Sequence, residues 1–183
     1  MKKAFPIALM IFGLVFVGAG IFTAAKGYDA KKEVRSELLA QNITTTPDAS
    51  IPNVRVQDAA TAKSMADIID THAREATGNK TYAEMGRFLA TGGGDTSDEA
   101  LAVKDASGQP VPNPLRNVAF QANSLRTSLF TSVMAFNVAD LVIGLGLMII
   151  VLGLAIGGVG IALGSLAIPA LARRVHVDPV AAR

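Results

Sequence analysis

The sequence contains no cysteine and no tryptophan, and only 17% of its 183 residues are charged. The lack of cysteine excludes disulfide scaffolds, thiolate zinc sites and thiol nucleophiles. Aromatic residues make up 5% of the chain, and the net charge of +2 comes without the basic block that is typical of nucleic-acid binding. We therefore expect no nucleic-acid partner. Half of the residues are hydrophobic, and together with the low share of charged residues this makes the chain too apolar for an ordinary soluble domain.

The first long apolar run covers residues 4–25 and contains no charged residue. About 20 apolar residues are enough to cross the hydrocarbon core of a bilayer. The alternative is a cleaved signal peptide, whose apolar region usually has only about 7–15 residues. The run is longer than that, so we predict that residues 1–25 form an uncleaved transmembrane helix.

A second uncharged run, residues 141–172, ends at Arg173 and Arg174. It has no polar turn in the middle, so we predict one helix rather than a hairpin, with a transmembrane segment at 140–172. The apolar pattern continues upstream, which predicts that this helix starts near Pro114, outside the membrane. The last eleven residues, 173–183, are predicted to be a cytoplasmic tail.

Basic residues gather at both ends of the chain, with Lys2 and Lys3 at one end and Arg173 and Arg174 at the other. Short basic segments stay in the cytoplasm by the positive-inside rule. The sequence thus predicts an all-α, multi-pass plasma-membrane protein in the lipid bilayer. Both termini are expected to be cytoplasmic, and residues 26–139 are expected to form a small helical extracytoplasmic domain.

Within that domain, apolar residues at helical spacing predict a helix over 58–77, with Gly78 where a C-terminal cap belongs. Thr81 and Glu84 have the spacing of a capping box, which predicts a second, short helix over 82–90.

Two stretches of the domain look irregular. Residues 41–56 are polar and read as a connector, and residues 91–113 are rich in Gly, Asp, Ser and Pro and predict a flexible loop. The domain has few large apolar side chains and would be marginally stable alone. We therefore expect it to need a partner surface.

Candidate catalytic groups are scarce. His72 lies near two carboxylates, but the other histidine, His176, is predicted to be across the membrane and cannot complete a metal site. We expect no catalytic residue, no metal and no other cofactor, with His72 packing on a helix face. An enzyme or metal-dependent sensor that uses His72 is the alternative. Asp140 is predicted to be a solvated or paired carboxylate at the outer interface rather than a proton relay.

Glycines recur along both predicted spans in stripes that let helix backbones approach closely in lipid. Such a stripe can pack the two helices of this chain together or contact another protein, and we expect that at least one contacts another protein. The residues concerned are Gly13, Gly20, Gly146, Gly153, Gly157, Gly160 and Gly164.

The segments ADIIDTHAREATGNKTYAEM (66–85) and NSLRTSLFTSVMAFNVADLVIGLGLMI (123–149) resemble a family of small two-span actinobacterial membrane proteins. Many members carry the label "aromatic ring-opening dioxygenase", which implies an iron site that this chain does not offer. The resemblance more usefully implies an accessory subunit, like those of the actinobacterial cytochrome bcc–aa3 respiratory supercomplex.

We therefore expect a non-catalytic accessory subunit that binds integral membrane subunits of a larger complex, with the respiratory supercomplex as the leading candidate. An accessory subunit of an envelope lipid transporter is the alternative. Contacts of the extracytoplasmic domain are expected within 67–84 and 123–140. The candidate residues are Ile68, Ile69, His72, Tyr82, Arg126, Phe130 and Asp140.

Overall fold

The computed structural model describes residues 4–175, with side chains described as far as residue 166. The basic residues Lys2 and Lys3 and the second histidine, His176, lie outside the described residues, as does most of the predicted tail 173–183. Topological predictions that depend on these residues therefore remain predictions.

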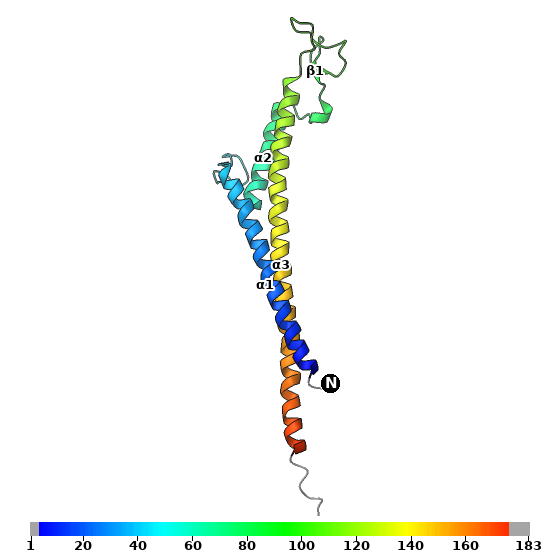
Figure 1. Cartoon of the computed structure of the whole chain (residues 1–183). Helices are drawn as coiled ribbons and strands as arrows, with labels where there is room; N and C mark the ends of the chain where they lie inside the picture. Colours follow the sequence, from blue (N-terminus) through cyan, green and yellow to red (C-terminus); the bar gives the residue numbers. More distant parts are fainter. Residues whose placement is uncertain (1–3, 176–183) are drawn as a thin grey trace, which may run out of the picture. The chain divides into compact units, whose positions relative to one another are not determined.

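The chain is mostly helical, as predicted, and three helices follow one another along it (Figure 1). The helices are α1 (Ala4–Ala40), α2 (Ala59–Ala76) and α3 (Pro114–Val175). Between α2 and α3 lie a single 3-10 turn, η1 (Tyr82–Glu84), and two short strands, β1 (Phe88–Leu89) and β2 (Asp95–Thr96). The helix predicted over 58–77 and the start predicted near Pro114 are both confirmed.

Helices α1 and α3 are each long and apolar enough to cross a membrane. Only 17% and 11% of the residues in their most apolar stretches are buried. A core helix of a soluble protein would be mostly buried, whereas these helices leave large apolar side chains exposed along their lengths. Both therefore have the properties of membrane spans.

The chain divides into two compact units. The hairpin unit contains Met1–Lys32 and Val138–Arg183, and the central unit contains Glu33–Asn137. The first boundary lies seven residues later than the one predicted at 25/26. The reason is that the charged continuation of α1 still packs against α3, since a Cβ added to Gly27 would lie 2.9 Å from the Ala139 carbonyl oxygen.

A seam of small residues holds the hairpin unit together. Gly13 faces Gly153, and Gly20 faces Gly146, so α1 and α3 run antiparallel. A Cβ added to Gly20 would lie 2.6 Å from the Gly146 carbonyl oxygen, which means that the two backbones touch where these glycines meet. The seam glycines recur every seven residues on each helix, the spacing that keeps two helices in contact through a left-handed supercoil.

The predicted helix-packing glycines all lie along this seam. All seven predicted helix-packing glycines lie within 4 Å of the opposite helix when a Cβ is placed on them. Both stripes face each other within the chain, which is one of the two uses that the sequence allows, and contact of a stripe with another protein stays a prediction. Within the two spans, the glycines that meet nothing within 4 Å are Gly18, Gly144 and Gly158, on the outer faces of the helices.

At the end of the seam, Lys31 of α1 donates a hydrogen bond to the Asp140 carboxylate at 2.6 Å. Asp140 is thus a paired carboxylate, one of the two states predicted for it. The side chains are 41% and 53% exposed, so in water the pair would contribute no more than about 1 kcal/mol.

We expect Asp140→Lys to weaken the hairpin by placing two ammonium groups opposite each other. The double exchange Lys31→Asp with Asp140→Lys should recover most of the loss, because it restores an opposite-charge pair. Thermal unfolding of the purified protein in detergent measures both effects. A double variant no more stable than Asp140→Lys would mean that the pairing contributes nothing.

The core of the central unit is formed by the end of α1, by α2 and by the first half of α3. Phe136, Val56 and Thr45 are its largest fully buried side chains. Two small residues of α2, Ala62 and Ala66, are completely buried, which allows α2 to pack closely on its neighbours. The core cluster consists of Leu38, Val56, Ala62, Ala66, Leu129 and Phe136.

The connector between α1 and α2 is more ordered than its composition predicts. Thr45 and Val54 pair through a backbone hydrogen bond of 2.9 Å, and a second bond of the same length joins Val56 to Ile43. The buried hydroxyl of Ser64 in α2 accepts a hydrogen bond from the backbone N–H of Ile51 at 2.9 Å. The connector therefore folds back on itself and is fastened to α2.

The segment between α2 and α3 differs in part from the predictions made for it. The helix predicted over 82–90 is only the turn η1, although the capping box of Thr81 and Glu84 is present. Strand β1 follows, and it pairs antiparallel with β2. The predicted flexible loop over 91–113 contains β2, and isolated bridges join Ala90 to Ala102 and Lys104 to Pro110, so it has more local pairing than its composition indicates. Its flexibility stays a prediction.

Candidate functional site

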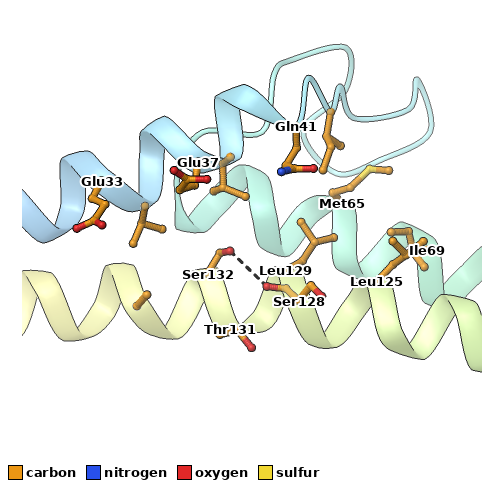
Figure 2. Close-up of a pocket in the computed structure, with 14 residues that line it drawn as sticks. Glu33, Glu37, Gln41, Met65, Ile69, Leu125, Ser128, Leu129, Thr131 and Ser132 are labelled. Atoms are coloured by element: carbon orange, nitrogen blue, oxygen red, sulfur yellow. Dashed lines mark hydrogen bonds between the residues drawn. The ribbon is translucent and has the colours of Figure 1, made fainter.

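An open apolar groove of about 810 Å³ lies in the central unit, between the end of α1, the side of α2 and α3 (Figure 2). Val34 and Leu38 line it from α1, Met65 and Ile69 from α2, and Leu129 from α3. These side chains also belong to the core or pack against it. The groove is thus a part of the core that the chain itself leaves uncovered.

Polar side chains edge the groove on two sides. Glu33, Glu37 and Gln41 follow one another at four-residue intervals along α1, so they share one face of that helix. Ser128 and Ser132 lie on the α3 side, where the Ser132 hydroxyl donates to the Ser128 carbonyl at 3.3 Å (Figure 2). Because this hydroxyl is already bonded to its own helix, it adds little polarity to the α3 side of the groove.

Helix α2 owes its place beside the groove to its first turn. Asp58 is the N-cap, and its carboxylate accepts a hydrogen bond of 2.8 Å from the backbone N–H of Thr61. The Thr61 hydroxyl in turn accepts a bond of 3.2 Å from the Asp58 backbone N–H. Partial burial by itself would raise the pKa of Asp58, but the hydrogen bonds from Thr61 and the Ala60 backbone, together with the positive charge of Arg35, outweigh it and hold this pKa below its ordinary value.

The lowered pKa of Asp58 predicts an acid-sensitive cap. A carboxyl whose pKa is lower when folded stabilises the fold above its unfolded pKa, about 3.9, and that stability is lost as the pH falls through the folded pKa. We expect Asp58→Ala to cost about 1 kcal/mol at pH 7. Asp58→Asn retains a capping oxygen and should cost less.

Thermal unfolding of the two variants and the wild type at pH 7 and pH 3 tests this. The advantage of the wild type over Asp58→Asn should shrink at pH 3, because this pH lies below the unfolded pKa of about 3.9 and the unfolded chain takes up a proton there. An advantage of equal size at the two pH values would show that the cap does not titrate as described.

The residues predicted for the α2 contacts have separate roles. Ile69 lines the groove, whereas Ile68 is only partly buried and does not line it. His72 lies on a face of α2 and contacts a neighbouring side chain: its Nε2 lies 2.7 Å from an Asp48 carboxylate oxygen, with nearly half of the side chain exposed. This contact fastens the connector to α2.

Most of the other predicted contact residues make contacts within the central unit. Arg126 of α3 contacts Asp70 of α2 at 2.9 Å, and its guanidinium lies 5.9 Å from the ring centroid of Phe130. The guanidinium of Arg116 lies over the Tyr82 ring, 4.0 Å from the ring centroid. Asp140 belongs to the hairpin unit, where it pairs with Lys31. Of the seven candidates, only Ile69 lines the groove.

Sequence reasoning missed the α1 side of the groove, whereas the lining residues of α3 all lie within the predicted contact range 123–140. One signal was available: Val34 and Leu38 continue an apolar stripe beyond the first span, flanked at the same spacing by Glu33 and Glu37. That pattern indicates a helix with one apolar face outside the membrane. It does not show which part of that face another helix covers.

Within the described residues, no three His, Asp or Glu side chains cluster as a metal site would require. The arrangement offers an apolar surface with an acidic edge, which suits binding rather than bond-breaking chemistry. A comparison with known proteins finds no matching family model, no matching curated protein and no matching solved structure.

Proposed function

We propose that this chain is a non-catalytic accessory subunit of a larger membrane protein complex. The observation that carries the proposal is the open groove of the central unit, about 810 Å³ and mostly apolar, which no segment among residues 4–175 covers. Apolar surfaces of this kind typically mark contacts with other molecules. The exposed outer faces of both spans supply a second apolar surface, open to lipid or to other subunits.

The proposed topology has both termini in the cytoplasm and the central unit on the outer side of the plasma membrane. Basic residues at the two ends of the sequence support it through the positive-inside rule. In this arrangement the groove would present itself to the outer portions of neighbouring membrane subunits.

The respiratory supercomplex is the first partner to look for. The resemblance of residues 66–85 and 123–149 to small actinobacterial membrane proteins supports this choice, and the layout of two spans around one small domain agrees with it. An envelope lipid transporter is the alternative partner. Both proposals give the chain the same role, which is packing against larger subunits.

Purification of the tagged chain from host membranes in a mild detergent tests the proposal. We expect co-purifying integral membrane subunits in near-stoichiometric amounts, with the haem absorption bands of cytochromes b, c and a if the partner is the respiratory supercomplex. A colourless preparation with transporter subunits would favour the alternative partner. A pure homo-oligomer would contradict the accessory role.

The enzyme alternative depends on His72 and has its own test. We expect His72→Ala to leave the purified complex and its activity unchanged within about twofold, because a partly exposed contact between His72 and Asp48 contributes little. Loss of activity from an intact complex would show that His72 has a chemical role.

A further inference from the structure

We infer that the groove binds one helix of a partner protein, and that this helix presents apolar side chains together with Lys or Arg residues one turn apart. This inference rests on the proposed function, since it names the chemistry of the partner that an accessory subunit would bind. It is drawn from the two edges of the groove and from the residue types that line it.

Positive charge on the partner helix would complement the acidic edge of the groove. Glu33 and Glu37 are four residues apart on α1, both exposed, so their like charges repel along the helix. Among the described residues, neither carboxylate has an ion-pair partner within 4.0 Å, and the nearby Arg35 is bonded to Gln57 instead. Two cations one turn apart on another helix would match this spacing.

The opposite edge suits a closely packed helix. Ser128, Ser132 and Ala135 are small and line the groove at intervals of four and three residues along α3. Small residues at such spacing let a second backbone approach closely, and the serine hydroxyls do not require a partner because they bond to their own helix. The apolar floor, including Leu38 and Leu129, would contact the apolar side chains of the incoming helix.

A phospholipid fits the groove less well. None of the fourteen residues that line it is Lys, Arg or His, so the groove offers no cation to a phosphate group. The two glutamates would repel an anionic headgroup. The residue types of the groove therefore favour a basic protein helix over a phospholipid.

The first experiment uses the absence of cysteine from the chain. Ser128→Cys places a single thiol at the groove, and Met134→Cys places one on the outer side of the same helix, where Met134 is 61% exposed. Each variant is labelled with benzophenone maleimide in host membranes, illuminated and purified, and the cross-linked peptides are identified by mass spectrometry. We expect Ser128→Cys, but not Met134→Cys, to cross-link to a helix of an integral membrane protein that carries Lys or Arg.

The second experiment reverses the acidic edge. The double variant Glu33→Lys with Glu37→Lys is compared with Glu75→Lys and Glu99→Lys, a pair of exposed residues away from the groove with the same change in net charge. We expect the groove variant to retain at least tenfold less partner than the control at equal helicity. Intermediate retention by Glu33→Gln with Glu37→Gln would show that charge, and not misfolding, is responsible.

The outcomes separate the inference from the proposed function. Cross-links from Ser128→Cys only to lipid or to a second copy of this chain, or equal retention by the two double Lys variants, would overturn the inference while a co-purifying complex kept the proposed function. A wild-type chain that retains no membrane subunit would overturn both.

Discussion

Gly20→Leu is expected to separate the two membrane helices, whereas Gly18→Leu, two residues earlier on α1, should have almost no effect. A Cβ at Gly20 would lie 2.6 Å from the Gly146 carbonyl oxygen and 2.8 Å from the Ile150 backbone nitrogen. Backbone atoms cannot rotate away as a side chain can, so the helices must move apart. The cost should reach or exceed the upper end of the about 1–3 kcal/mol that is typical of overpacking.

Gly18 is the matched control because a Cβ there meets nothing within 4 Å. Thermal unfolding of the two variants in the same detergent, followed by the loss of helicity, measures the difference. Equal melting temperatures for Gly20→Leu and Gly18→Leu would mean that α1 and α3 do not touch along this seam.

Phe136→Ala should produce a comparably large loss in the central unit. Phe136 is only 2% exposed and is the largest fully buried side chain in the described part of the chain. Truncating a buried phenylalanine typically costs about 3–5 kcal/mol, because the transfer free energy is lost and a cavity remains. For a small domain of marginal stability, a loss of this size would unfold much of the population.

The control for this variant is Met134→Ala, which removes a side chain that is 61% exposed on the same helix. Hydrogen exchange of the α2 amides in the detergent-solubilised protein reports on the central unit. We expect protection of these amides to collapse in Phe136→Ala and to persist in Met134→Ala. Preserved protection in Phe136→Ala would contradict the assignment of Phe136 to the core.

The long elements could be predicted from the sequence because strong constraints fix them. A bilayer requires about 20 apolar residues per span, and both runs exceed that length. Pro114 is well suited to the first turn of a helix, and Gly78, with a φ of +63°, ends α2 as a C-cap glycine does. These signals lie within a few residues of the features that they predict.

The small β region and the packing partner of the glycine stripes could not be predicted in the same way. Strands of two residues are too short to show an alternating pattern, and Gly86 fits closely against the Thr96 backbone, a contact visible only in three dimensions. Gly13, Gly20 and Gly27 mark a packing face in the sequence, but nothing local says whether the other helix belongs to this chain. The groove could not be predicted for the same reason, since three segments that are distant in the sequence form it.

The most direct test of the accessory role is the size of the particle that contains the chain. Host membranes with the tagged chain at its natural level are dissolved in a mild detergent and separated on a native gel, and the chain is detected through the tag. The proposed function predicts that nearly all of the 19.0 kDa chain migrates with a much larger complex of membrane subunits. Migration of most of the chain as a monomer or a small homo-oligomer would contradict it.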